Sequence, residues 1–373
     1  MPTKVVHILK WLKGGGVEQR RHLLARHLPA EEFDQTFLAL EHDYGWRERF
    51  EKEDVSLRCL PSKLQWAPFD WRGILEVASH LRDIDPDIVH GAVFEGVSMA
   101  ALAGTLAGCD NIIIEEIGDP SVRRWKGHLL TGLYARLASH CVGVSQPVTD
   151  YFVDTLKVSP DKVHCVENGV RDMQPPTAEK RRQLRRKWGI GADDFVVGSV
   201  GRLDDNNKRY STLIDVIARL REDHEHIKLL LVGDGPDRQQ LENHAAQRNL
   251  AEEVIFTGFQ NDVEDLYGVM NTFALFSLHE SFGLVVAEAM LCELPTVVTA
   301  VGGMKHLTIP GETGFQVPRD QPQQAASALQ KIVNDRDMAK RMGLAGRKRA
   351  LAKYTESAYV ERVRQLYKIV LNS

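Results

Sequence analysis

The stretch His279-Glu280-Ser281-Phe282-Gly283-Leu284-Val285-Val286-Ala287-Glu288 predicts a strand, a tight loop and a helix. It separates an apolar run at 272–278 from an apolar helical run ending near Cys292. A helix start leaves unpaired N–H groups and a partial positive charge, so the turn at Gly283 suits a phosphate. Glu280 precedes the helix and Glu288 lies over a turn inside it, where carboxylates can accept hydrogen bonds from sugar hydroxyls. The stretch fits a nucleotide sugar; the alternative is a strand–helix unit with two solvated glutamates.

Both halves of the chain alternate short apolar strands with longer helical segments. In the first half we predict strands at 5–9, 35–40, 56–60, 87–90, 111–115, 141–144 and 163–166, and helices at 17–28, 74–81 and 97–106. In the second half we predict strands at 195–200, 228–232, 254–257, 273–276 and 295–299, and helices at 180–187, 210–220, 238–248, 263–270, 323–334 and 354–371. This alternation predicts an α/β fold with parallel sheets covered by helices on both faces. Two prolines, Pro175 and Pro176, predict a linker at 172–177.

The composition narrows the class of protein. At 373 residues two domains are expected, and 43 % apolar and 26 % charged residues are ordinary for a soluble globular protein. A net charge of −4 gives no case for a nucleic-acid partner. Five scattered cysteines without a Cys-x-x-Cys argue against a disulfide framework and a zinc site. The start of the chain has no signal-peptide form, and no apolar run approaches the ~20 residues of a membrane span. We therefore expect a cytoplasmic protein in which any membrane contact is peripheral.

Three motifs lie in order along the chain: Gly14-Gly15-Gly16-Val17-Glu18, then Gly201-Arg202-Leu203 with Lys208, then Glu280-Ser281-Phe282-Gly283 with Glu288. Together they resemble the signature of retaining glycosyltransferase family 4, the glycosyl transferases group 1. The resemblance implies the GT-B fold, in which two doubly wound Rossmann-like domains face each other across a cleft. It implies an acceptor-side domain at 1–172, a nucleotide-sugar-binding domain at 173–352, and a helix at 353–373 that crosses back to the first domain.

Two cations follow the strand that ends at Gly201. Arg202 and Lys208 match the family pair that binds the donor's diphosphate and stabilises it as a leaving group. An arginine fork and a lysine point charge both suit phosphate oxygens. Asp204 and Asp205 are their alternative partners in the sequence.

The two glutamates of the decisive stretch are expected to hold the sugars of the donor. Glu280 matches the family residue near the transferred hexose, and Glu288 matches the residue that binds the donor ribose. The segment 257–260 lies where family members hold the base, and glycines allow close approach to phosphate or sugar. The further donor-binding positions that the resemblance implies are Gly15, Gly16, Gly258, Phe259, Ser281, Phe282, Gly283, Leu284 and Val285.

His90 ends a predicted strand, where a histidine is either structural or part of the site. The resemblance implies a catalytic position near the sugar and the acceptor. Ala92 stands where many relatives carry a second histidine or an acid, and the acceptor-side groups best placed to compensate are Glu95, Glu116 and Asp119. Two other positions depart from the family pattern: Arg209 replaces a usual glycine, and His306 stands where an acid is frequent.

Two aspartate motifs, at 83–85 and 85–87, match the Asp-x-Asp that holds manganese in the other glycosyltransferase fold. Both precede a strand, whereas the metal motif should follow one. The segment 224–226 carries two histidines and a glutamate but lacks further ligands. We therefore expect no metal and no cofactor, with the diphosphate charge neutralised by Arg202, Lys208 and the helix start.

The segment between Asp119 and Asp150 carries four cations and no acids. These cations are Arg123, Arg124, Lys126 and Arg136, and they accompany an apolar stripe of Trp125, Leu129, Leu133 and Tyr134. A basic amphipathic helix can lie on an anionic membrane. The alternative, which we favour from the sequence, is an ordinary helix that buries the stripe.

These patterns predict a hexosyltransferase that moves a sugar from a UDP- or GDP-sugar to a hydroxyl of a glycan, a glycolipid or a small-molecule glycoside. Retention of the anomeric configuration follows from the resemblance alone. Two alternatives stay open: a glycoside phosphorylase-type relative with the same donor cleft, and a catalytically silent sugar-nucleotide-binding subunit.

Overall fold

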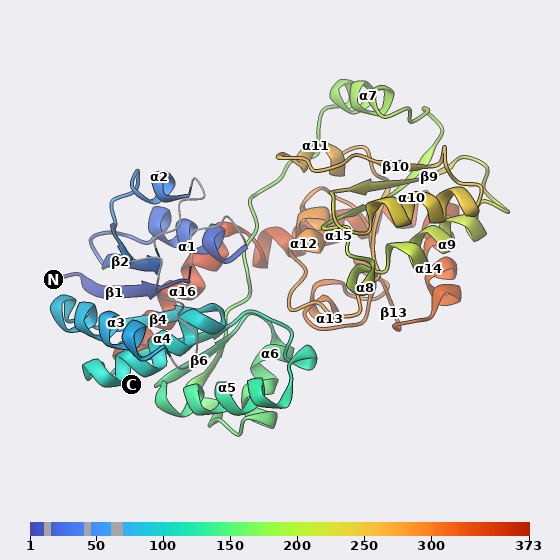
Figure 1. Ribbon diagram of the computed structural model, residues 1–373. Helices are drawn as coiled ribbons and strands as arrows, with labels where there is room; N and C mark the ends of the chain where they lie inside the picture. Colours follow the sequence, from blue (N-terminus) through green and yellow to red (C-terminus); the bar gives the residue numbers. More distant parts are fainter. Residues whose placement is uncertain (11–15, 41–45, 61–69) are drawn as a thin grey trace. The chain divides into compact units, whose positions relative to one another are not determined.

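The computed structural model describes residues 1–10, 16–40, 46–60 and 70–373 (Figure 1). They form two compact units. The first unit joins residues 1–169 to the terminal segment 356–373, and the second holds residues 170–355. Gly14 and Gly15 of the first motif lie outside the described residues.

The first unit is built on a seven-stranded parallel sheet with the order β3-β2-β1-β4-β5-β6-β7. The chain order reverses at β1, which pairs with both β2 and β4, so the sheet is doubly wound. The strands are β1 (Thr3–Ile8), β2 (Phe33–Leu40), β3 (Ser56–Leu60), β4 (Ile88–Ala92), β5 (Ile112–Glu116), β6 (His140–Gly143) and β7 (Val163–Cys165). All seven predicted strands are confirmed.

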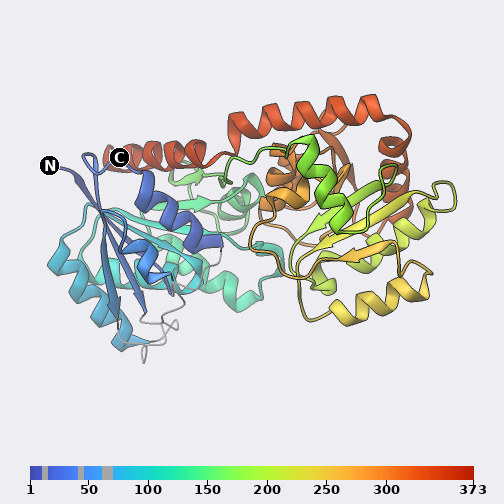
Figure 2. The same ribbon diagram turned by 90° about the horizontal axis from the view of Figure 1, so that it is seen from above.

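Helices cover both faces of this sheet because successive strand residues point to opposite sides. On β1, Val5 belongs to a core formed with α1 and α16, and Val6 to a core formed with α3, α4 and α5. Figure 2 shows α16, in red, running beside α1. The helices are α1 (Gly16–His27), α2 (Arg47–Phe50), α3 (Trp71–Ile84), α4 (Val93–Ala107), α5 (Trp125–Leu137), α6 (Gln146–Asp150) and α16 (Glu356–Leu371).

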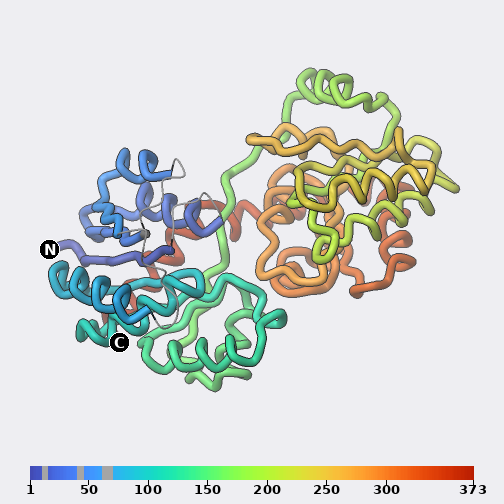
Figure 3. Tube along the Cα trace, in the orientation of Figure 1, coloured from blue at the N-terminus to red at the C-terminus, as the bar shows by residue number. Residues whose placement is uncertain are grey.

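The second unit follows an extended segment at 172–177, which has neither helix nor strand, as its prolines predict (Figure 3). Its six-stranded parallel sheet has the order β10-β9-β8-β11-β12-β13. The strands are β8 (Phe195–Val200), β9 (Ile227–Val232), β10 (Val254–Phe256), β11 (Thr272–Leu275), β12 (Thr296–Thr299) and β13 (Gly314–Val317). The order again reverses at the first strand of the unit, β8. The predicted pair of Rossmann-like domains is therefore confirmed.

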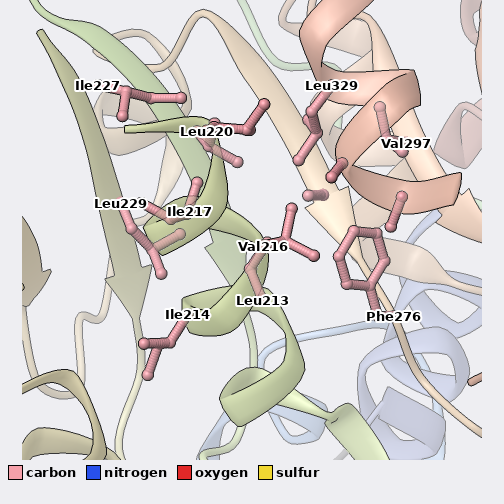
Figure 4. Packing of buried hydrophobic residues seen from close by; sticks show 14 of the residues in the cluster. Leu213, Ile214, Val216, Ile217, Leu220, Ile227, Leu229, Phe276, Val297 and Leu329 are labelled. Atoms are coloured by element: carbon pink, nitrogen blue, oxygen red, sulfur yellow. The ribbon is translucent and has the colours of Figure 1, made fainter. Parts of the chain in front are cut away.

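The helices of the second unit cover its sheet in the same way. They are α7 (Ala178–Lys187), α8 (Asp205–Lys208), α9 (Tyr210–Leu220), α10 (Arg238–Gln247), α11 (Glu264–Tyr267), α12 (Leu284–Leu291), α13 (Met304–Leu307), α14 (Pro322–Asn334) and α15 (Arg336–Lys353). Figure 4 shows the packing on one face, where Ile217 of α9 lies near Leu229 of β9, and Leu329 of α14 lies on the same side as Val297 of β12. This dry core fixes the strand ends that carry the motif loops.

The sequence patterns miss β13, α15 and the short helices α2, α6, α8 and α13, and they overextend α11. Helix α15 contains Gly343, where an added Cβ would lie 2.0 Å from the carbonyl oxygen of Glu293, so its backbone packs directly on the end of α12. Interior glycines weaken the helical signal, which explains the missed helix. The predicted helix at 263–270 is wrong in length because α11 ends before Gly268, where an added Cβ would meet Pro176 at 2.1 Å.

Candidate functional site

The stretch 276–291 forms the predicted strand–loop–helix connection between β11 and α12. Gly283 precedes α12 with φ of 103°, a left-handed conformation that glycine adopts without strain. An added Cβ there would lie 3.1 Å from side-chain carbons of Met304 and Leu307. The loop is also held by Gly303, whose N–H donates to the carbonyl oxygen of Glu280 over 3.1 Å. The helix start is therefore a fixed feature, with Ser281, Phe282, Leu284 and Val285 around it.

Lys208 and Glu280 meet in an ion pair, with 2.7 Å between Nζ and Oε2. Their side chains keep 18 % and 19 % exposure, so both atoms remain near solvent. The alternative partner Asp205 is engaged elsewhere, since its Oδ1 accepts from the N–H of Ser211 over 2.8 Å. Two of the predicted catalytic residues, which lie far apart in the sequence, therefore meet at the carboxyl ends of β8 and β11.

Asn207 joins the two loops and was missed by sequence reasoning. Its carbonyl oxygen accepts from the N–H of Leu278 over 2.8 Å, and its Oδ1 accepts from the N–H of His279 over 3.1 Å. Its Nδ2 donates to the carbonyl oxygen of His279 over 3.3 Å. Asn207 therefore sets the position of Lys208 relative to Glu280.

The two arginines of the same loop, Arg202 and Arg209, differ in their contacts. Arg202 is exposed, and within the described residues it forms no ion pair. Arg209 has φ of 56°, so the loop adopts the left-handed bend that the usual family glycine would adopt freely. The side chain of Arg209 turns toward Asp320, 3.8 Å away. The loop therefore has the left-handed conformation expected for glycine, although an arginine stands at this position.

Glu288 lies on α12, and a buried tyrosine fixes its carboxylate. The hydroxyl of Tyr267 donates to Oε2 of Glu288 over 2.7 Å. Burial raises the pKa of Glu288, and the hydrogen bond from Tyr267 opposes that rise. Glu280 and Glu288 thus stand at separate positions, as their spacing predicts. Tyr267 carries no signal in the sequence, because it lies 21 positions from its partner.

On the other side of β8, the loops that follow β8, β9 and β10 pack closely against one another at glycine residues. The N–H of Gly233 donates to the carbonyl oxygen of Gly258 over 3.1 Å, and an added Cβ at Gly235 would lie 2.4 Å from the carbonyl oxygen of Leu203. The interpretation of 233–236 as a strand–helix turn is confirmed. Phe259, next to Gly258, is 73 % exposed. An exposed aromatic ring at this edge offers a flat face for a base.

In the first unit, His90 belongs to a buried cluster of charged and aromatic groups. Its Nδ1 lies 2.8 Å from the hydroxyl of Tyr367, and its Nε2 lies 3.3 Å from Oε2 of Glu115. Arg21 contacts the same Glu115 oxygen at 2.5 Å. His90 is 1 % exposed, which agrees with the structural alternative, while the catalytic position that the resemblance implies stays a prediction.

The buried charges of this cluster leave the pKa values of both His90 and Glu115 below their ordinary values. Burial and then the charge of Arg21 lower the pKa of His90 to about 4, so the imidazole is neutral at neutral pH. Burial alone would raise the pKa of Glu115, but Arg21 holds that pKa well below its usual range. Glu115, Arg21 and Tyr367 were not predicted, because their contacts join segments distant in sequence.

The other candidates of the first unit are engaged locally. Gly16 begins α1, while Gly15 lies outside the described residues. Glu95 pairs with Lys10 at 2.6 Å, and Glu116 pairs with Arg123 at 2.5 Å. Asp119 accepts from the N–H of Ser121 and begins a short 3₁₀ turn. All three acidic side chains therefore have structural partners.

Helix α5 does not bury its apolar stripe, which corrects the interpretation favoured from the sequence. Tyr134 is buried, but Trp125, Leu129 and Leu133 are 70 %, 67 % and 45 % exposed. Within the described residues, no helix is both long and apolar enough to cross a bilayer. The same residues hold no group of three or more histidine, cysteine or acidic side chains that could bind a metal ion.

Two protein-family models match the chain, one in each unit. The model described as Glycosyl transferases group 1 matches residues 180–349. The model described as Glycosyl transferase 4-like domain matches residues 15–169.

Two curated proteins illustrate the similarity in sequence. The putative glycosyltransferase EpsD of Bacillus subtilis (strain 168) is 26 % identical over 206 residues, which cover 55 % of this chain and 54 % of EpsD. The Vi polysaccharide biosynthesis protein VipC/TviE of Salmonella typhi is 29 % identical over 303 residues, covering 76 % of this chain and 50 % of that protein. Each match spans about half the length of the curated relative.

Among solved structures, Anabaena Alr3699/HepE in complex with UDP matches with a TM-score of 0.85 at 21 % identity, covering 98 % of this chain and 100 % of HepE. The same protein in complex with UDP-glucose gives a TM-score of 0.83 at 21 % identity, covering 98 % of this chain and 99 % of HepE. At this identity the likeness shows a shared fold.

Proposed function

Because this chain belongs to the glycosyl transferases group 1 family and has the GT-B fold, we propose that it transfers a hexose from a UDP-sugar to an acceptor hydroxyl with retention. The observation that carries the proposal is the meeting of Lys208 and Glu280 beside the start of α12. UDP is preferred to GDP as the carrier because HepE is similar in fold and was solved with UDP and with UDP-glucose.

The donor diphosphate would lie between the two cations and the helix start. Arg202 can grip phosphate oxygens with its planar fork, and Lys208 can supply a point charge. The first N–H groups of α12 have no acceptor within the helix and point toward negative charge. These groups together can neutralise a diphosphate, so we propose that the reaction requires no metal ion.

Binding of the diphosphate would also release Glu280. In the structure, the ammonium of Lys208 contacts Oε2 of Glu280. When phosphate oxygens take over that ammonium, the carboxylate can accept hydrogen bonds from hydroxyls of the hexose. The contact between Lys208 and Glu280 would thus be replaced by two contacts, one from Lys208 to the phosphate and one from Glu280 to the hexose. This replacement would couple diphosphate binding to the orientation of the sugar.

The uridine end would use the residues held at the neighbouring strand ends. Glu288 would accept from the ribose hydroxyls, since Tyr267 fixes the direction of its carboxylate. Phe259 would pack against the base, and the backbone around Gly258 would contact its edge. Gly15 and Gly16 remain proposed donor contacts from the first unit.

For retention we propose a same-face substitution, in which the bond from the anomeric carbon to the diphosphate oxygen breaks while the acceptor oxygen attacks from the same face. The diphosphate leaves with the bonding electron pair, and its oxygen accepts the proton of the acceptor hydroxyl. Arg202, Lys208 and the start of α12 would stabilise the negative charge that develops on the diphosphate. Preorganised charges of this kind make a large contribution to many enzymatic rates.

The acceptor is proposed to be a glycan or a lipid-linked glycan, and α5 supports a lipid-linked one. Trp125, Leu129 and Leu133 expose an apolar stripe, and exposed Arg124, Lys126 and Arg136 accompany it. Apolar insertion and charge attraction together favour an anionic bilayer surface. We therefore include peripheral membrane contact through α5 in the proposed function.

A thermal-shift panel tests the donor. UDP, GDP and ADP, and their glucose, mannose and N-acetylglucosamine forms, are added without metal and then with magnesium. A donor that binds the native state raises the melting temperature by mass action. Selective stabilisation by a metal-free UDP-sugar, together with release of UDP when an acceptor glycan is added, is expected. A flat panel with folded protein would contradict the proposal, and stabilisation by a nucleotide sugar without release of UDP would favour the silent subunit.

A further inference from the structure

The second unit contains a pocket of about 250 Å³ that lies away from the proposed donor loops. Its wall includes Phe195, Asn271 and Pro295, which begin or directly precede β8, β11 and β12. In a parallel sheet these amino ends lie at the edge opposite the carboxyl ends that carry Arg202 and Glu280. The pocket is therefore a separate feature from the proposed donor site.

Three cationic side chains line this pocket: Arg181, Arg336 and Lys340. Arg181 donates to the neutral carbonyl oxygen of Met270 over 3.3 Å. The guanidinium of Arg336 lies 4.2 Å from the centre of the Phe195 ring. Within the described parts of the chain, none of the three cations forms an ion pair. Their charges are therefore not neutralised by a carboxylate.

A fourth cation, Arg185, lies buried near this group. It donates to the carbonyl oxygens of Gly191, Asp194 and Val269 over 2.8, 2.6 and 3.0 Å. Burial lowers the pKa of Arg185, and the charge of Arg181 lowers that pKa further. Burial also lowers the pKa values of Arg181 and Arg336. The carbonyl oxygens hold Arg181 and Arg185 in place and carry no net charge of their own.

The acidic groups near the pocket are committed elsewhere. Glu293 lines it, but this carboxylate lies 3.8 Å from Nε of Arg347. Asp335 caps α15, where its Oδ1 accepts from the N–H of Met338 over 2.8 Å. Arg336 occupies the first turn of α15, where the helix dipole disfavours a cation. An anion in the pocket would relieve this repulsion and meet the positive end of the helix.

We propose that this pocket binds a small phosphate monoester, independently of the transfer reaction. The phosphoryl oxygens would accept from Arg181, Arg336 and Lys340, and charge-assisted bonds of this kind are among the strongest in proteins. The organic part would lie on the apolar rings of Pro175 and Pro176, which form part of the same wall. A volume of 250 Å³ is below the ~300–1,000 Å³ usual for drug-sized ligands, so the ligand must be small.

Calorimetric titration of the full chain with phenyl phosphate tests the proposal. Arg336→Ala and Lys340→Ala should each raise Kd about tenfold or more, the loss expected for one hydrogen bond to a charged group. Arg341→Ala removes an exposed charge from the same helix outside the pocket, and it should leave Kd unchanged. Arg202→Ala should also bind phenyl phosphate normally, because the donor edge is a different phosphate site.

Several results would overturn the proposal. They are absence of binding to the wild-type chain at millimolar phenyl phosphate, unchanged Kd in both Arg336→Ala and Lys340→Ala, and a loss of affinity confined to Arg202→Ala. Equal affinity for benzyl alcohol, which is neutral, would refute the anionic class of ligand. Both pocket substitutions lie at exposed positions, so unchanged melting temperatures are expected to show that the fold is intact.

Discussion

Lys208 and Glu280 form an ion pair with 2.7 Å between Nζ and Oε2, although 72 positions separate them in the sequence. A partly exposed pair of this kind adds little to stability, typically ~0–1 kcal/mol. Its position at the carboxyl ends of two central strands is typical of a ligand site in an open α/β sheet. The position of the pair therefore supports the proposed role in donor binding.

Lys208→Ala is expected to lower kcat about 10²–10³-fold while the melting temperature changes little, because the lost charge acts on the departing diphosphate. Steady-state assays of UDP release and melting curves measure the two effects. Lys180→Ala is a matched control, since Lys180 forms an ion pair of the same 2.7 Å length with Asp265 in the same unit. Equal activity losses in the two variants would contradict the assigned role of Lys208.

Arg202→Ala separates an enzyme from a silent binding subunit. Arg202 is exposed and forms no ion pair among the described residues, so its removal should leave stability unchanged. Turnover should fall about 10²–10³-fold if the guanidinium stabilises the leaving diphosphate. Arg219→Ala removes another exposed arginine of the second unit and should keep full activity. Retained turnover in Arg202→Ala would refute the assignment.

Local sequence patterns predict strands and motif loops well in this chain because those signals are short in range. The seven strands of the first sheet and the turn at Gly283 depend on apolar runs and on one glycine. Contacts between distant segments are not predicted in this way. The pairing of Tyr267 with Glu288, and the burial of His90 by groups from three other elements, depend on how the sheet and helices pack.

The wrong sequence-based predictions also arise from contacts between distant segments. Helix α15 is hidden by Gly343 and Gly346, and at Gly343 the structure uses the missing side chain for close packing on Glu293. The stripe on α5 has helical spacing, but spacing alone does not tell whether a stripe is buried or exposed. Tyr134 packs inward while Trp125 and Leu129 face solvent. The direction of an amphipathic face is decided by the rest of the fold.

Glu288→Gln should stabilise the fold, or leave it unchanged, while weakening donor binding. Burial raises the pKa of Glu288, so the folded state holds this proton to higher pH than the unfolded chain, and stability falls as pH rises through that range. Glutamine removes the buried charge but can still accept from Tyr267. The gain in melting temperature should be present at pH 7, should shrink as pH falls through the raised pKa toward 4.5, and should stay small below 4.5.

Donor titrations complete this test. Loss of one carboxylate oxygen that accepts from ribose should raise the Kd for the UDP-sugar about tenfold. Glu222→Gln, at an exposed position of the second unit, is the control for both measurements. A Glu288→Gln variant that is less stable at neutral pH, or that binds donor normally, would count against a buried functional carboxylate.

Replacing Trp125 and Leu129 together by alanine should abolish binding to anionic vesicles, since these side chains form the most exposed part of the α5 stripe. Sedimentation with vesicles of phosphatidylglycerol and phosphatidylcholine measures the effect, and binding should weaken with added salt. Leu75→Ala, at an exposed leucine of α3, is the matched control. Absence of wild-type binding, or self-association in solution that depends on the same stripe, would contradict the membrane role.

The buried cluster around His90 predicts that the chain loses stability as pH falls from 6.5 to about 4. The unfolded imidazole takes up a proton near its ordinary pKa of 6.5, whereas burial and Arg21 lower the folded pKa to about 4. The unfolded state then binds more protons, so stability rises with pH across this window and is lost on acidification. The shift corresponds to about 3 kcal/mol at most.

Melting temperatures between pH 4 and 7 should therefore fall more steeply for the wild type than for His90→Gln. His27→Gln, a surface substitution in the same unit, should keep the wild-type slope. Equal slopes in all three proteins would show that His90 takes up protons equally in both states, and that the cluster does not keep its imidazole neutral.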